Sequence, residues 1–157
     1  SAEAEFVARE LGVARFVSCQ EEWNVLNRAI ERDVVPMMRE YKLGMLPFFP
    51  LASGLLTGKY KRDAMPKGAR LTDNPKFANR GYVNDDNFAK VEKLEAYAKS
   101  QDRSLLELAF GWLASQSVTA SVIAGATKPE QIASNVEAAG WAMTAADLAA
   151  IDGIVGG

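Results

Sequence analysis

Apolar and polar residues alternate along the chain with two periods, which predict helices in some segments and strands in others. Residues 2–11 place apolar side chains at helical spacing and end at Gly12, the usual glycine after a helix. Residues 30–41 repeat this pattern before Gly44. Short apolar runs bounded by turn residues are instead typical of buried strands, and we identify them at residues 14–20, 45–49 and 118–124.

Residue patterns typical of helix N-termini recur in the second half of the chain. Asp85 or Asp86 can cap a helix that continues to about Gln101. Capping-box patterns predict further helices where Ser104 precedes Glu107, Thr127 precedes Glu130 and Thr144 precedes Asp147. Pro129 fits the first turn of the middle one, because a residue there needs no partner for its backbone N–H.

The order of these elements favours an α/β fold with a parallel sheet. Strands separated by helices are typical of parallel βαβ units. Residues 60–85 interrupt this order with a long irregular segment rich in charged residues, Pro and Gly, and such a segment is often functional. Three parallel strands alone leave two unpaired edges, so we expect the chain to form part of a larger sheet or barrel.

Composition narrows the possible chemistry. The 157 residues carry a net charge of −2, which gives no reason to expect a nucleic-acid or membrane surface. The chain has one cysteine and no histidine, which excludes within it a Ser-His-Asp triad, an internal disulfide and a histidine- or thiolate-ligated zinc site. The single Cys19 fits a reducing compartment, and the charged N-terminal stretch is unlike a signal peptide, so we expect a cytoplasmic protein.

Candidate ligand contacts follow each predicted strand, where the carboxyl ends of parallel strands meet at one edge. Gln20 follows the first strand and has an amide that can pair with an amide ligand. "PLASGLLTGKY", residues 50–60, follows the second and joins small residues to a lysine. "GATKPEQIASN", residues 125–135, follows the third and begins a helix, whose N-terminus can bind an anion. Each segment also has a plain structural interpretation, as a loop, a solvated lysine or a capped surface helix. Together they favour an elongated phosphate-bearing ligand, and a dinucleotide has that shape.

The same segments resemble the aldo-keto reductase superfamily. "WNVLNRAIERDVVPMMREYKLGMLPFFPLASGLLTGKY" and "VIAGATKPEQIASNVEAAGWAMTAADLAAID" are similar to that family in order and spacing, over roughly Phe16 to Asp152. The resemblance implies a (β/α)8 TIM barrel. The chain would be its C-terminal half, about strands 6–8 with their helices, as a single partial domain over residues 1–157. It also implies an NADP(H)-dependent enzyme that reduces small aldehydes and ketones to alcohols.

The resemblance assigns cofactor-binding roles residue by residue. Gln20 matches the residue that holds the nicotinamide carboxamide, and Phe48 matches the aromatic residue that stacks on the nicotinamide ring. Phe49 stands where most relatives have Ser, so the hydroxyl contact would be lost. The pyrophosphate loop and the cations near the phosphates match Pro50, Leu51, Ala52, Ser53, Lys59 and Arg70. The adenosine and 2′-phosphate pocket matches Gly125, Thr127, Lys128, Gln131 and Asn135, although Ser134 replaces a common Glu.

The catalytic residues implied by the family are missing from this chain. They are a Tyr, a Lys, an Asp and often a His from the first half of the barrel, and no residue here matches them. We therefore expect the chain alone to be inactive in carbonyl reduction. The alternative is a non-catalytic dinucleotide-binding or regulatory half-barrel module. In both cases the bare edges predict association with the missing N-terminal half or with a second copy.

Overall fold

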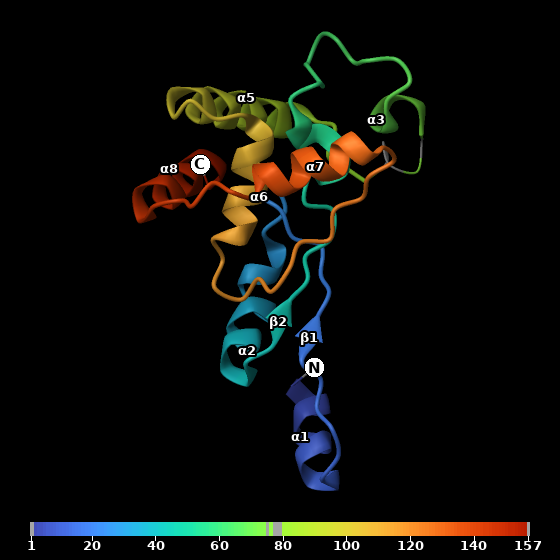
Figure 1. The fold of residues 1–157 in the computed structure, drawn as a ribbon, viewed down its shortest axis with the longest axis vertical. Coiled ribbons are helices and arrows are strands. Elements are labelled where there is room, and N and C mark those ends of the chain that lie inside the picture. The colour runs from blue at the N-terminus through green and yellow to red at the C-terminus, as the bar shows by residue number, and fades with distance from the viewer. Residues whose placement is uncertain (1, 75, 77–79, 157) are drawn as a thin grey trace.

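A computed structural model describes residues 2–74, 76 and 80–156 of the chain. Figure 1 shows most of the helices gathered at one end of an elongated molecule, with α1 at the other end and β1 and β2 between them. The elements are α1 (Ala2–Leu11), β1 (Ser18–Cys19), η1 (Ala29–Glu31), α2 (Val34–Tyr41), β2 (Gly44–Met45), η2 (Ala52–Thr57), α3 (Arg70–Asp73), α5 (Asp85–Ser100), α6 (Leu105–Ala114), α7 (Pro129–Ala138) and α8 (Ala145–Val155). The predicted helices are confirmed, except that the one predicted over residues 30–41 is divided into η1 and α2, and the strands are shorter than predicted.

The strands form a small parallel sheet. β1 pairs with β2 in parallel register. Residues 118–124 lie along the other edge of β2 and its continuation, but they make only two isolated parallel bridges, Met45 with Thr119 and Phe48 with Ile123. The prediction of a continuous third strand is therefore wrong. Pro47 lies between the two bridges and has no N–H, so one ladder hydrogen bond cannot form.

α6 lies at the centre of the helical layer and supplies much of the apolar core. Its buried residues include Leu108, Trp112 and Leu113, each with no exposed surface. Trp112 packs edge-on against Trp23, with the ring centroids 5.4 Å apart. Burying one large apolar side chain contributes roughly 1.5–3 kcal/mol, so this contact holds the segment after β1 against the helices.

Helix caps explain why the helix boundaries could be predicted. The Ser104 hydroxyl accepts a hydrogen bond from the Glu107 N–H at 3.1 Å, and the Glu107 carboxylate accepts one from the Ser104 N–H at 2.8 Å, as the capping-box pattern requires. Thr144 and Asp147 close the same box at α8. At α5 the cap is one residue earlier than predicted, because Asn84 rather than Asp85 or Asp86 accepts from the Asn87 N–H.

The segment predicted as a long loop, residues 60–85, is partly built into the core. Its short helix α3 carries Leu71, and Tyr60, Leu71 and Tyr82 are all buried. The Tyr60 hydroxyl accepts a hydrogen bond from the Leu71 N–H at 3.2 Å. These described parts of the segment are therefore fixed by packing, while residues 61–64 and 72–74 are exposed.

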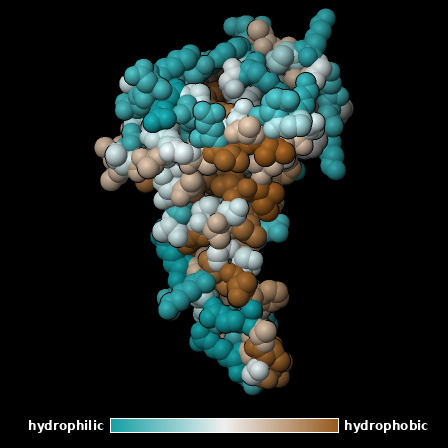
Figure 2. Space-filling model, in the orientation of Figure 1, coloured by the Kyte–Doolittle hydropathy of each residue, from teal (hydrophilic) through white to brown (hydrophobic). Residues whose placement is uncertain are grey.

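Exposed apolar side chains mark the two outer edges of the parallel layer. Phe16 and Val17, beside β1, are 71% and 74% exposed. Ile132 and Val136 on α7, next to residues 118–124, are 59% and 72% exposed. Figure 2 shows apolar surface gathered below α7 and again near α1. Exposed apolar surface of this extent is typical of an interaction surface.

The hydrogen bond between α5 and α8 predicts a stability change in alkaline solution. The Tyr97 hydroxyl donates to Asp147 Oδ1 at 2.7 Å. This hydrogen bond, with burial and the Asp147 charge, raises the pKa of Tyr97 to about 12. An unfolded tyrosine loses its proton near pH ~10, so the contribution is complete below that pH and is lost as the pH rises toward 12. Tyr97→Phe is expected to cost about 1 kcal/mol at pH 7 and to flatten the alkaline loss of stability, measured by urea unfolding.

Tyr41→Phe is the matched control for this prediction. The Tyr41 hydroxyl forms no hydrogen bond with the part of the chain that the structure describes, and its ring contact with Phe6 is retained in the variant. Its alkaline profile should follow the wild type. An unchanged profile for Tyr97→Phe would contradict the assigned hydrogen bond.

Candidate functional site

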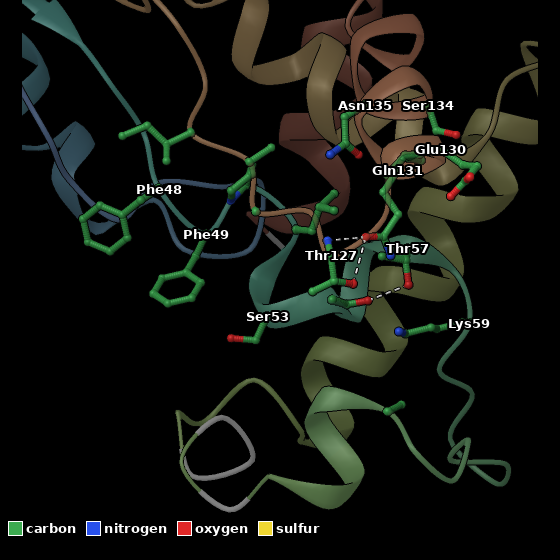
Figure 3. Close-up of a pocket in the computed structure, with 18 of the residues that line it drawn as sticks. Phe48, Phe49, Ser53, Thr57, Lys59, Thr127, Glu130, Gln131, Ser134 and Asn135 are labelled. Atoms are coloured by element: carbon green, nitrogen blue, oxygen red, sulfur yellow. Dashed lines mark hydrogen bonds between the residues drawn. The ribbon is translucent and has the colours of Figure 1, made fainter.

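A cleft of about 960 Å³ lies where the second and third predicted strands end. Figure 3 shows side chains of the segment after β2, of η2 and of α7 around it. The residues predicted as ligand contacts that line the cleft are Phe48, Phe49, Pro50, Leu51, Ser53, Lys59, Gly125, Thr127, Gln131 and Asn135. Segments separated by some 70 residues in the sequence are thus brought to one concave surface, as parallel strands with a shared carboxyl edge predict.

The backbone of the loop at the cleft is strained. Phe49, Ala52 and Ser53 have φ values of 53°, 47° and 59°, in the left-handed region that residues with a Cβ rarely adopt. Gly54 follows with φ 109°, and the angles of Ser53 and Gly54 interrupt η2. Such conformations cost roughly 1–3 kcal/mol each and cluster at ligand sites, where the surrounding contacts hold them.

Ser53 carries a buried hydroxyl that lacks a hydrogen-bond partner within the described chain. The residue is only 2% exposed and lines the cleft. A buried hydroxyl without a partner costs free energy, because it loses its hydrogen bonds to water and gains none. A ligand oxygen in the cleft would supply the missing partner, so Ser53 favours a polar ligand beside η2.

Lys59 brings a positive charge to the same cleft. Its ammonium nitrogen lies 5.1 Å from the centroid of the Tyr60 ring. No ion pair joins Lys59 to a carboxylate among the residues that the structure describes. A cation left without an anionic partner at a cleft is suited to a phosphate group.

The N-terminus of α7 is closed by a side chain that differs from the predicted one. Lys128 is the N-cap residue, and Gln131 rather than Glu130 reaches back to it. Gln131 Oε1 accepts from the Thr127 N–H at 2.7 Å, from the Thr127 hydroxyl at 3.2 Å and from the Lys128 N–H at 3.2 Å. The capping pattern predicted from Thr127 to Glu130 is therefore wrong by one residue. Figure 3 shows this contact between Thr127 and Gln131 at the cleft.

Several predicted contacts do not line the cleft. Gln20 and Lys128 are exposed and stand outside its lining, and Ala52 is fully buried beneath it. Arg70 is the first residue of α3, but its side chain lies outside the described part of the structure. A contact between these residues and a bound ligand stays a prediction.

Sequence reasoning missed other residues that line the cleft. They are Gly54, Thr57, Gly68, Ala69, Asn74, Leu106, Ile123, Ala124 and Glu130, and Ser134, which stands where many relatives have Glu, lines the cleft too. Gly54 and Thr57 lie within the loop motif of residues 50–60, so the sequence did contain a signal for them. In the structure the Thr57 hydroxyl donates a hydrogen bond to the Gly54 carbonyl at 2.7 Å. Leu106, on α6, had no local signal, because its position depends on how α6 packs against α7.

No tyrosine lines the cleft within the described structure. Tyr60 and Tyr82 are buried, and Tyr97 is bound to Asp147. Burial, followed by the hydrogen bond to Glu22, raises the pKa of Tyr82 to about 12. A phenol with a raised pKa is a poor proton donor at neutral pH, so the described residues offer no tyrosine acid at this site.

The residues that the structure describes contain no cluster of three or more His, Cys, Asp or Glu side chains that could hold a metal ion. No helix among them has the length and apolar character needed to cross a bilayer.

The sequence model of the Aldo/keto reductase family matches residues 2–155. A rice (Oryza sativa subsp. japonica) protein named probable voltage-gated potassium channel subunit beta is 40% identical over 139 residues, which cover 87% of this chain and 42% of that protein. The NADH-specific methylglyoxal reductase of Escherichia coli K12 is 33% identical over 132 residues, which cover 82% of this chain and 38% of that enzyme.

The chain belongs to the aldo/keto reductase family. It spans about two fifths of the length of these curated relatives.

Proposed function

We propose that the chain is the cofactor-binding, C-terminal half of an NADP(H)-dependent aldo-keto reductase, corresponding to about strands 6–8 of a (β/α)8 barrel. The intact protein would reduce small aldehydes or ketones to alcohols. The observation that carries this proposal is the unpartnered hydroxyl of Ser53, buried in a strained loop at the cleft of a chain from this family. The residues on either side of Ser53 along the cleft fit the rest of a dinucleotide.

Three groups of residues fit the three parts of a nicotinamide dinucleotide. Ser53 and Lys59 would hold the pyrophosphate, the first as a hydrogen-bond donor and the second as a counter-charge. Phe48 would stack against the nicotinamide ring. Thr127, Gln131 and Asn135 would hold the adenosine end near the N-terminus of α7. When bound, the cofactor supplies a hydride, and this chain's residues bind it, orient it and exclude water from it.

The preference for NADP(H) over NAD(H) depends on a contact to the 2′-phosphate. We propose that Lys128 makes this contact, because it is exposed at the N-cap of α7, beside the cleft. Adenosine 2′,5′-bisphosphate should then bind at least about tenfold more tightly than 5′-AMP, which lacks the discriminating phosphate. Calorimetric titration with both fragments measures this preference.

Lys128→Met is expected to remove the preference between the two fragments. Lys93→Met is the control, because Lys93 is an exposed lysine on α5, away from the cleft. A wild-type chain that binds both fragments equally would contradict the NADP(H) assignment. The cleft would then be a dinucleotide site that does not select for the 2′-phosphate.

The chain alone is expected to be inactive in carbonyl reduction. No tyrosine lines the cleft in the described structure, and the proton donor of the reaction would have to come from elsewhere. NADPH oxidation in the presence of methylglyoxal should stay at the buffer rate. Turnover that depends on the chain and on the carbonyl compound would overturn this expectation.

A non-catalytic dinucleotide-binding or regulatory module is the second candidate function. The same lack of a tyrosine at the cleft favours it, and so does the similarity to proteins named as potassium channel β subunits. Sequence upstream of Ser1 distinguishes the two functions. A segment carrying the family's tyrosine, lysine and aspartate would support the reductase.

We further propose that the exposed apolar edges are covered by the first half of the barrel. Phe16 and Val17 at one edge and Ile132 and Val136 at the other are the residues that such strands and helices would bury. Burying them would remove exposed apolar surface from both edges. Without that half we expect a second copy to cover the edges, so sedimentation of this chain alone should show a dimer, and a clean, stable monomer would contradict this.

The cytoplasm is the proposed location. One free cysteine and no disulfide among the described residues support a reducing compartment.

A further inference from the structure

Glu22 lies just outside the cleft, at the centre of a polar network. It follows β1 and forms a parallel bridge with Phe48. Its carboxylate accepts hydrogen bonds from the Tyr82 hydroxyl, from the Arg80 guanidinium and, at 3.3 Å, from the Asn27 amide. The Glu22 side chain is 21% exposed, so these donors replace most of its contact with water.

Arg80 connects this network to the aromatic end of the cleft. Its guanidinium carbon lies 4.1 Å from the centroid of the Phe49 ring, in cation–π contact. Phe49 in turn packs edge-on against Phe48, with the centroids 5.4 Å apart. Both phenylalanines line the cleft. A chain of contacts therefore runs from Glu22 through Arg80 to the rings at the cleft.

A second connection joins the same residues. The Asn24 amide donates to the Phe49 carbonyl at 3.0 Å and to the Tyr82 hydroxyl at 2.8 Å. Phe49 itself has a left-handed φ of 53°, which a phenylalanine adopts only when surrounding contacts hold it. The Glu22 network and Asn24 thus act on the backbone and the ring of the same strained residue.

The Glu22 carboxylate is charged at neutral pH. Burial would raise the pKa of Glu22, but hydrogen bonds from Tyr82, Arg80 and Asn27, with the Arg80 charge, hold it below its usual value. The carboxylate is therefore ionised and paired with Arg80. An ionised, hydrogen-bonded pair of this kind fixes the guanidinium in one orientation more firmly than a neutral contact does.

We propose that Glu22 is a positioning residue for the cleft: it holds Arg80 against Phe49 and thereby slows the exchange of a dinucleotide bound beside the two phenylalanines. The part that concerns the dinucleotide rests on the proposed function. The part that concerns Arg80 does not, and it can be tested without any ligand.

Limited proteolysis tests the position of Arg80 in the ligand-free chain. Trypsin must bind the Arg80 side chain to cleave after it, so cleavage requires this side chain to leave Glu22 and Phe49, and the rate reports the population of that open form. Glu22→Gln keeps the shape of the side chain and removes its charge. Cleavage after Arg80, identified by mass spectrometry, is expected to become about tenfold faster in this variant.

Glu21→Gln is the matched control. Glu21 is the neighbouring carboxylate, and its side chain contacts the Cys19 thiol at 3.9 Å rather than Arg80. Cleavage after Arg80 should keep the wild-type rate in this variant. Equal rates in the Glu21 and Glu22 variants would overturn the positioning role.

Stopped-flow dissociation of NADPH tests the effect on the ligand. Glu22→Gln is expected to release NADPH about threefold faster than the wild type, the size expected from losing one cation–π contact. In an Arg80→Gln background the Glu22 substitution should add nothing, because it acts only through Arg80. A general loss of structure would instead accelerate release in both backgrounds, and that result would overturn the proposal.

The two experiments separate the possible failures. If the wild-type chain does not bind NADPH, both the proposed function and the effect on exchange are overturned, and the trypsin rates still decide whether Glu22 positions Arg80. If NADPH binds and leaves at one rate from all variants, the proposed function stands and the effect on exchange is wrong.

Discussion

Gly54→Val is expected to lower the free energy of unfolding by about 3 kcal/mol and to weaken NADPH binding at least about tenfold. Gly54 has a φ of 109°, which residues with a side chain rarely adopt. A Cβ at this position would meet the Tyr60 ring at 3.3 Å. Tyr60 is 1% exposed and hydrogen-bonded to the Leu71 N–H, so the ring cannot move without disturbing α3. The loop must change shape instead, and Ser53 moves with it.

Gly58→Ala is the control, because it adds backbone strain without a clash that would distort the loop. Gly58 also has a positive φ, 79°, but nothing lies within 4 Å of a Cβ built there. We expect a loss of about 1 kcal/mol and little change in NADPH affinity. Urea unfolding and calorimetric titration of both variants measure the contrast. Comparable losses of affinity in the two variants would show that the shape of the loop at Ser53 and Gly54 is unimportant for binding.

Asn24→Ala is expected to lower the free energy of unfolding by about 3 kcal/mol. The Asn24 side chain has no exposed surface, and its amide group makes four hydrogen bonds. Its oxygen accepts from the backbone N–H groups of Leu26 and Asn27, at 3.0 and 2.9 Å. Its nitrogen donates to the Phe49 carbonyl and the Tyr82 hydroxyl. Truncation leaves these buried groups without a partner, and each costs roughly 1–3 kcal/mol unless water reaches it.

Asn27→Ala is the control for this second prediction. Asn27 is only partly buried, and its amide makes longer hydrogen bonds, at 3.3 Å to Glu22 and 3.4 Å from the Ala29 N–H. A loss below about 1 kcal/mol is expected. If urea unfolding gave Asn24→Ala and Asn27→Ala the same stability, Asn24 would not be the residue that joins the turn after β1 to Phe49 and Tyr82.

The helices could be predicted because their signals are local. The capping boxes at Ser104 and Thr144 lie within four residues of the helices they begin, and both are present in the structure. The strands depend on distant partners, so their extent could not be predicted from their own apolar runs. Pro47 illustrates this: it sits within an apolar run, yet its missing N–H limits the pairing with residues 118–124.

The candidate site could be predicted from the sequence only where its residues lie within a recognisable motif. The loop from Pro50 to Lys59 and the start of α7 were found from their motifs, and most of their predicted residues line the cleft. The network around Glu22 was missed, because Tyr82 lies 60 residues away in sequence. Gln20 was predicted from its place after the first strand and from the resemblance, and the structure leaves it outside the cleft lining.

The central claim is that the cleft between η2 and α7 binds a nicotinamide dinucleotide. Calorimetric titration of the wild-type chain with NADPH, beside Gly54→Val and Gly58→Ala, tests it most directly. We predict saturable binding of one NADPH per chain, retained in Gly58→Ala and weakened at least about tenfold in Gly54→Val. No saturable binding to the wild-type chain, or equal binding to all three proteins, would contradict the assignment of this cleft.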